Sequence, residues 1–263
     1  MKITILGARG SIPTDGKDMS QFGGATSCVL AETDDLALFL DAGTGITSIP
    51  DIGARKIAIL ITHPHIDHVL GLPFCTCLAE EGRKIDFYAT VKYGLGVEQQ
   101  ISRMLSEPLW PCTINDYPAD IACHDITSFP FEINKVEISG MESNHPGGCT
   151  IFKIMYGGKS FVYATDYEHS EEKDAELIDF CRGTDLLLYD GQYTEEEYDI
   201  KKGYGHSTPK HAVMIMQKSG AKMMRILHHD PGHNDEMLLK MEEEIKTDTI
   251  AFARQGEEIW LQR

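Results

Sequence analysis

Short apolar runs alternate with polar and glycine-containing segments along the whole chain, and most of these runs have the length of a strand. The first run covers residues 2–7, and the runs at 26–32 and 36–41 are joined by the turn residues Asp34 and Asp35. An apolar run of four to eight residues bounded by turn residues is typical of a buried strand. The pattern predicts further strands at 57–61, 85–89, 131–138, 141–144, 150–156, 160–165, 186–190, 223–228, 249–252 and 258–261.

Segments with helical periodicity lie between some of these strands. They predict helices at 66–81, 97–105, 171–181, 208–220 and 234–246. Thr208 followed by Pro209 is a favourable helix start, because threonine caps the first turn and proline suits the first helical position. Strands in runs with helices between them predict an α/β fold. The length fits a single domain, 1–263, in which the proline-containing segment 92–118 is interpreted as a cap beside a cleft.

The charge balance restricts the partners. The chain has 24 basic and 41 acidic residues, which give a net charge of −17. Binding of a large nucleic acid usually requires a basic surface, so this class of partner is not expected. A small phosphorylated substrate remains compatible, because bound dications would reverse the local field.

Cysteine usage and hydropathy favour a cytoplasmic protein. The seven cysteines form no C-x-x-C pair, which favours reduced thiols. Arg9 interrupts the first apolar run too early for a signal peptide, and no apolar segment reaches the roughly 18 residues of a membrane span. No membrane partner is expected, and a homodimer is one assembly that we consider.

The densest group of potential metal ligands follows the apolar run 57–61. His63 and His65 are two positions apart, so on an extended backbone their side chains point the same way. Asp67 and His68 follow as the chain turns and can face a second point nearby. Imidazole and carboxylate groups are ligands of Zn²⁺, with Mn²⁺ or Fe as alternatives. This pattern predicts a site for two divalent metal ions rather than a group of ordinary surface histidines.

Residues 62–68 match the T-H-x-H-x-D-H signature of the metallo-β-lactamase superfamily, and the chain resembles that family over nearly its whole length. The later landmarks occur in order: His145 in a Ser-Asn-His-Pro-Gly-Gly segment, Asp166 after an apolar run, and His229 at the end of another. The resemblance implies an αββα four-layer sandwich. In this fold two mixed β-sheets face each other, helices cover the outer faces, and the site lies at one edge.

The resemblance also implies a ligand set. One ion would be held by His63, His65 and His145, the other by Asp67, His68 and His229, and Asp166 would bridge them. A hydroxide shared by the two ions would be the nucleophile, and Asp67 is counted with the catalytic residues. His228 competes with His229 for the last position. The superfamily ligand is usually the second residue of a Thr-His pair, so we expect His229.

A further resemblance concerns the substrate. Gly205-His206-Ser207-Thr208, with Asp190 upstream, is similar to the His-Ser-Thr motif and acidic residue of the tRNase Z and phosphodiesterase branch. By analogy His206 would donate a proton to the leaving oxygen, and Asp190, which stands where tRNase Z has glutamate, would favour its protonated form. A plain helix-capping loop is the alternative. Ser207 and Trp110 are expected to contact the substrate.

These features predict a metal-dependent hydrolase, a phosphodiesterase that cleaves a small phosphodiester, with a cyclic ester as one candidate. One alternative is a tRNase Z-like ribonuclease. That enzyme carries a long basic arm where this chain has only 21 positions between His145 and Asp166. A second is a thioester hydrolase of the glyoxalase II type, which shares the first signature but does not need the Gly-His-Ser-Thr element. A third is a metal-dependent nucleotide-binding module without catalysis.

Overall fold

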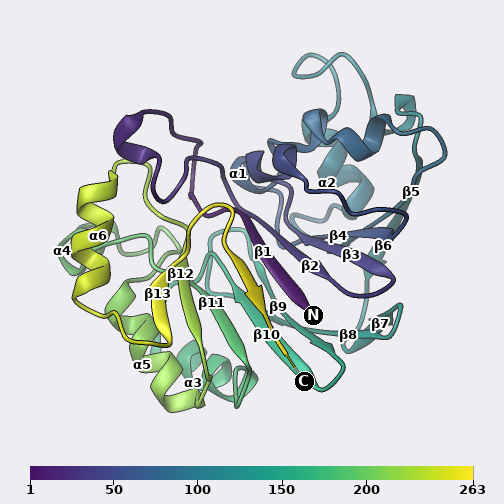
Figure 1. The fold of residues 1–263 in the computed structure, drawn as a ribbon. Coiled ribbons are helices and arrows are strands. Elements are labelled where there is room, and N and C mark those ends of the chain that lie inside the picture. Colours follow the sequence, from purple (N-terminus) through teal and green to yellow (C-terminus); the bar gives the residue numbers. More distant parts are fainter. Residues whose placement is uncertain (263) are drawn as a thin grey trace.

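Two seven-stranded sheets face each other in the computed structural model, which describes residues 1–262 (Figure 1). The first sheet has the order β14-β1-β2-β3-β4-β5-β6 and the second the order β13-β12-β11-β10-β9-β8-β7. The strands of the first sheet are β1 (Lys2–Gly7), β2 (Cys28–Glu32), β3 (Leu36–Leu40), β4 (Lys56–Ile61), β5 (Lys84–Thr90), β6 (Asp120–Ile126) and β14 (Glu258–Trp260). Those of the second are β7 (Phe131–Ile133), β8 (Val136–Glu142), β9 (Thr150–Tyr156), β10 (Lys159–Ala164), β11 (Leu186–Asp190), β12 (Met224–Leu227) and β13 (Ile250–Phe252).

Helices cover the outer faces of both sheets. They are α1 (Ile66–Val69), α2 (Val97–Met104), α3 (Glu171–Phe180), α4 (Glu195–Lys201), α5 (Pro209–Ser219) and α6 (Asp235–Glu243). Apolar residues of α3, α5 and α6 share a core with the second sheet, and α2 packs on the first (Figure 1). The four-layer α/β sandwich predicted from the sequence is therefore confirmed. No helix within residues 1–262 is long and apolar enough to cross a membrane.

Both faces of the central strands are buried, which explains why the sequence reads as continuous apolar runs. On β10, Phe161 and Tyr163 face the core between the sheets, whereas Val162 and Ala164 face the helices. On β4, Leu60 faces the inner core and its neighbours face outward. Strands covered on both faces lose the alternation of apolar and polar residues that a half-exposed strand would show.

The parallel strands direct the functional residues to one edge of the sandwich. In the first sheet β3 runs parallel to β4, and in the second β10, β11 and β12 run parallel to one another. Parallel neighbours end at the same edge of a sheet. The residues that follow these strands, with β8 contributing from the second sheet, are therefore brought together even though they are distant in sequence.

Several local predictions differ from the structure. The strands expected at 131–138 and 141–144 are instead β7 and β8, which are divided at Asn134 and Lys135, both at positive φ. The helix expected at 66–81 is broken after α1, because Gly71 and Pro73 divide it into short 3-10 turns. Strand β6 was not predicted, since it has no buried residue and most of its exposed positions are polar. The acidic helix α4 was not predicted either. The segment 92–118 contains α2 and packs partly against the first sheet. Its role as a cap stays a prediction.

Candidate metal centre

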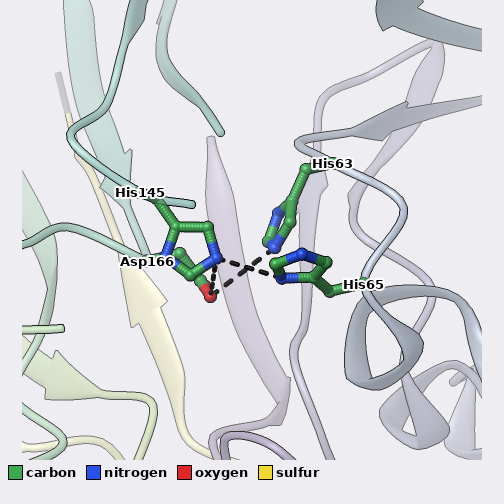
Figure 2. Close-up of side chains that lie close together, drawn as sticks. All are labelled: His63, His65, His145 and Asp166. Carbon is green, nitrogen blue, oxygen red and sulfur yellow. Dashed lines mark hydrogen bonds and ion pairs between the residues drawn. The ribbon is translucent and has the colours of Figure 1, made fainter. Parts of the chain in front are cut away.

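Four side chains from three strand ends form the first potential ligand group: His63, His65, His145 and Asp166 (Figure 2). One ligand atom from each lies within 4.8 Å of the others. His145 Nε2 lies 3.0 Å from His65 Nδ1, and Asp166 Oδ1 lies 3.6 Å from His63 Nε2 and 3.5 Å from His145 Nε2. The nitrogens thus converge on the same carboxylate oxygen.

A second group of potential ligands lies on the other side of Asp166. It consists of Asp67, His68 and His228, whose ligand atoms also lie within 4.8 Å of one another. Asp67 Oδ2 lies 3.3 Å from His68 Nε2 and 3.1 Å from His228 Nε2. Asp166 Oδ2 lies 3.1 Å from His68 Nε2 and 3.3 Å from His228 Nε2. Asp166 therefore presents one oxygen to each group, which is the arrangement that a bridging carboxylate requires.

The carboxylate of Asp41, which follows β3, orients two of the rings. His68 Nδ1 donates to Asp41 Oδ2 at 2.7 Å. The Thr62 hydroxyl donates to Asp41 and lies 3.0 Å from Nδ1 of His63. The Tyr163 hydroxyl also donates to Asp41, at 3.1 Å. Such outer hydrogen bonds fix the tautomer and orientation of a metal-binding imidazole.

The other three rings have outer partners as well. These are the Gly205 carbonyl for His145 Nδ1 (2.9 Å), Gln192 Oε1 for His228 Nδ1 (3.0 Å) and the Tyr93 hydroxyl for His65 Nε2 (3.4 Å). By contrast, Nε2 of His63 and of His68 is buried and makes no hydrogen bond of suitable geometry in the described chain, although carboxylate oxygens lie nearby. A buried polar atom without a partner requires an explanation. In each ring, one nitrogen is hydrogen-bonded to the surrounding protein and the other points toward the centre of the cluster. This arrangement fits bound cations.

Burial sets the charge of the first histidine group. It lowers the pKa of His63 well below the ordinary value and also lowers the pKa of His65 and His145. Neighbouring imidazoles add to this effect, because two like charges in one buried group repel each other. The three rings are therefore neutral near pH 7, which is the form that binds a metal ion.

The carboxylates reverse this trend in the second group. Burial alone would lower the pKa of His228, but Asp166 and Asp67 outweigh it and raise the pKa to about 9. The pKa of His68 is raised well above its ordinary value by the same carboxylates, again against burial. The histidines in turn hold the pKa of Asp67 and Asp166 well below the ordinary range, although burial opposes this. Asp67 and Asp166 are therefore ionised near pH 7, and their negative charges suit this group to a bound cation.

Backbone strain is concentrated at the same strand ends. Asp41, Asp166 and His228 have φ values of 61°, 53° and 64°, in the left-handed region that residues with a Cβ rarely adopt. Each lies one or two residues beyond a strand, β3, β10 or β12 respectively. Such strain persists only where the surrounding structure enforces it, and it is common at functional sites.

The structure corrects the choice between His228 and His229. The ring of His229 points into the core, where it stacks on Phe252 and meets Phe22 edge-on, and its Nε2 donates to the Ala253 carbonyl at 2.9 Å. The backbone of His229 is bonded to Ala8 and Gly10 on the first sheet's side, so the residue is extended and its ring points away from that of His228. The expectation of His229 in the cluster is wrong, and His228 takes the position.

The predicted pair of His206 and Asp190 forms beside the cluster. His206 Nδ1 donates to Asp190 Oδ2 at 2.8 Å, and both residues are buried. The His206 ring stacks on His228 with centroids 4.8 Å apart and meets His145 edge-on at 5.2 Å. It therefore contacts one ring of each ligand group, and Nδ1 is the nitrogen occupied by the carboxylate.

The two residues expected to contact the substrate, Ser207 and Trp110, both have partners within the fold. Ser207 is fully buried, and its hydroxyl lies 2.9 Å from His169 Nδ1 and 3.2 Å from the Tyr189 hydroxyl. Trp110 packs edge-on against Phe74 and donates its ring N–H to the Tyr117 hydroxyl. Ser207 therefore has no accessible surface to offer a substrate, whereas Trp110 is partly exposed and its contact with a substrate stays a prediction.

Several residues of the site were not singled out from the sequence. Asp41 ends an apolar run as Asp190 does, and that shared setting could have identified it. Gln192 and Tyr93 carry no comparable signal. Each becomes a partner of a cluster histidine only through contacts between segments far apart in the chain.

Comparison with known proteins agrees with this geometry. The model of the "Beta-lactamase superfamily domain" family matches residues 42–229, more than half of the chain. A ribonuclease Z of Haloarcula marismortui is 23% identical over 277 residues, covering 87% of this chain and 86% of the relative.

Two solved structures have similar folds. The metallo-β-lactamase fold protein YhfI from Bacillus subtilis has a TM-score of 0.73 at 18% identity, covering 98% of each chain. A diphosphatase from the PhnP family also has a TM-score of 0.73 at 18% identity, covering 99% of this chain and 98% of the other. The family match, the four-layer fold and the ordered His and Asp residues at its edge lead to one conclusion: this chain belongs to the metallo-β-lactamase superfamily of hydrolases.

Proposed function

We propose that this protein is a metal-dependent phosphodiesterase that cleaves a small phosphodiester. Two divalent cations, with Zn²⁺ favoured by the imidazole-rich ligand set, would be held by seven residues. These are His63, His65 and His145 for one ion, Asp67, His68 and His228 for the other, and Asp166 between them. Bound cations at such a site would supply Lewis-acid stabilisation of negative charge and lower the pKa of water.

The observation that carries the proposal is the His206–Asp190 pair beside this ligand set. The carboxylate of Asp190 accepts from Nδ1 and so fixes the tautomer and orientation of the ring. The Nε2 atom of His206 is left to hold a proton for the oxygen that leaves when a phosphoester bond breaks. Because His206 contacts a ring of each ligand group, it lies where a bound ester would be cleaved. A proton donor at this position suits an ester whose leaving oxygen must be protonated near neutral pH.

The surroundings of the cluster favour a small substrate with apolar or planar groups. Tyr93, whose hydroxyl lies against His65, is 63% exposed, and Tyr204, next to Gly205, is 64% exposed. Exposed aromatic side chains beside a polar centre can stack on a planar group such as a nucleobase.

The basic side chains of the loops near the cluster already have hydrogen-bond or ion-pair partners within the protein. Arg9 donates to the backbone carbonyls of Gly23, Asp230 and His233, Lys92 pairs with Glu142, and Lys201 pairs with Asp230. A polyanionic substrate would need free cations along its backbone. Together with the net charge of −17, this favours a substrate with one phosphodiester group.

RNA cleavage is the second candidate, because the curated relative is a ribonuclease. The segment from His145 to Asp166 argues for the smaller substrate. It contains only β9 and β10, joined by Gly157 and Gly158 at positive φ, which suits a tight hairpin turn and leaves no length for an arm.

The test compares substrates on one metal-loaded preparation. With Zn²⁺ or Mn²⁺, we expect hydrolysis of bis(p-nitrophenyl) phosphate and of cyclic nucleotides, and little cleavage of tRNA precursors. Efficient tRNA cleavage would favour the ribonuclease, and turnover of S-lactoylglutathione alone would favour a thioester hydrolase. Tight nucleotide binding without product, over several metals, would favour a binding module.

The role of His206 has its own test. His206→Ala is expected to lower kcat about 10²–10⁴-fold, the range typical of a lost proton donor, while metal content stays at two per chain. A fall in metal content would instead show that His206 is a ligand.

A further inference from the structure

Glu168 is a buried carboxylate outside the ligand set that binds a loop of the site. The residue is 9% exposed and lies two positions after Asp166. Its Oε1 accepts from the backbone N–H of Gly203 at 2.7 Å and from the Tyr198 hydroxyl at 3.3 Å, and its Oε2 accepts from the N–H of Gly205 at 2.9 Å. A carboxylate that accepts from backbone N–H groups forms stronger bonds than a neutral acceptor, so it restrains this loop firmly.

The loop that Glu168 holds touches both parts of the site. The Gly205 carbonyl accepts from Nδ1 of His145, and the next residue is His206, whose ring is bonded to Asp190. The loop lies very close to His145. Gly205 has a φ of +91°, and a Cβ at this position would lie 2.2 Å from His145 Nδ1. A displacement of the loop would therefore move the partner of His145 and the His206 ring together.

The backbone of Glu168 is anchored to the same region. Its N–H donates to the Asn144 carbonyl at 3.1 Å, and the Asn144 side-chain amide donates back to the Glu168 carbonyl at 3.1 Å. Asn144 precedes His145 in the chain. Glu168 thus connects the segment before His145, the segment after Asp166 and the loop before His206.

We propose that Glu168 is a positioning residue that sets His145 and His206 relative to each other through residues 203–205. It does not touch the reacting atoms; it acts on the cation held by His145 and on proton transfer by His206. The part that concerns His206 rests on the proposed function, whereas the part that concerns His145 is testable without substrate.

Glu168→Gln is the first test, because glutamine keeps the size but replaces one acceptor oxygen with an N–H donor. At saturating metal we expect kcat to fall about 10–100-fold with little change in KM, by analogy with the loss of an outer partner in a metal site. In a His206→Ala background the same substitution should change kcat less than about threefold, because interacting residues give non-additive effects. An equal fall in both backgrounds would overturn the coupling to His206.

A matched control separates positioning from general destabilisation. Glu242 is also a buried glutamate and is paired with Arg254 at 2.7 Å, but it lies on α6 and packs against β13. Glu242→Gln should lower the melting temperature and leave kcat within about twofold at a temperature where the protein is folded. If both variants lower kcat in proportion to their loss of stability, the positioning role is wrong.

Metal affinity provides a readout that does not depend on activity. In chelator competition, Glu168→Gln should bind Zn²⁺ about 10–100-fold more weakly than the parent protein, and Glu242→Gln should not. Unchanged affinity in Glu168→Gln would overturn the coupling to His145. If that variant does not fold, Glu168→Asp is the alternative, because it withdraws the carboxylate from the loop but keeps the charge. Glu168→Asp should also bind Zn²⁺ more weakly. An affinity and a kcat equal to those of the parent protein would overturn the proposal. A His206→Ala variant with full activity would contradict the proposed function while leaving this readout valid.

Discussion

Exchanging His228 and His229 one at a time for alanine should give two opposite phenotypes, although the residues are adjacent. His228 points its Nε2 at Asp67 and Asp166, with distances of 3.1 and 3.3 Å. His229 points into the core between Phe22 and Phe252. The first substitution removes a potential ligand, whereas the second removes a buried ring and its hydrogen bond.

The two costs can be worked from these contacts. A four-ligand zinc site binds with about 10–16 kcal/mol, so one ligand accounts for about 3 kcal/mol, or about 100-fold in affinity. His229→Ala loses the bond to the Ala253 carbonyl, worth about 1 kcal/mol, and leaves a cavity beside two aromatic rings, for a total of about 2–4 kcal/mol. In a domain of this size that corresponds to a fall in melting temperature of about 5–15 °C.

The assay measures Zn²⁺ affinity by chelator competition and melting temperature on metal-free samples. His228→Ala should show weak metal binding with a modest change in metal-free stability. His229→Ala should bind two ions per chain with a lower melting temperature, and His229→Phe, which keeps the ring packing, should recover part of the loss. Weakened metal binding in His229→Ala together with normal binding in His228→Ala would refute the assignment.

Three further outcomes follow from the contacts and charges described above. Gly205→Ala should weaken metal binding about tenfold or more, because a Cβ there collides with Nδ1 of His145 and moves its outer partner, which metal titration would measure. Metal affinity should rise with pH up to about 9, since the proton on His228 must leave before an ion binds, and titration in two buffers of different ionisation enthalpy should detect the released proton; affinity independent of pH would contradict this. Burial would raise the pKa of Glu242, but Arg254 holds it below the ordinary value, so this pair stabilises the protein above the unfolded pKa of about 4.3 and loses the effect as pH falls through the lower folded value. Glu242→Gln should therefore be less stable than the parent at pH 7 and approach it at pH 3 in denaturant titrations.

Local sequence patterns were sufficient for most of the fold. The buried strands appear in the sequence as apolar runs bounded by turn residues. The run that precedes His63 predicted both a strand and the position of the potential ligands after it. The same patterns were weaker where an element is half exposed, so β6 and α4 were not predicted. The reason is physical: burial imposes an apolar composition, whereas an exposed face can be filled by almost any polar residue.

The potential metal ligands that one segment supplies could be predicted from that segment, because the spacing of His63, His65, Asp67 and His68 is a local property. The choice of His228 over His229 was not local. It depends on a positive φ at the end of β12 and on the contacts of His229 with Phe22 and Phe252, which come from other parts of the chain. Because the backbone turns at His228, the two adjacent rings point in different directions, and only contacts with distant segments select which ring meets the cluster.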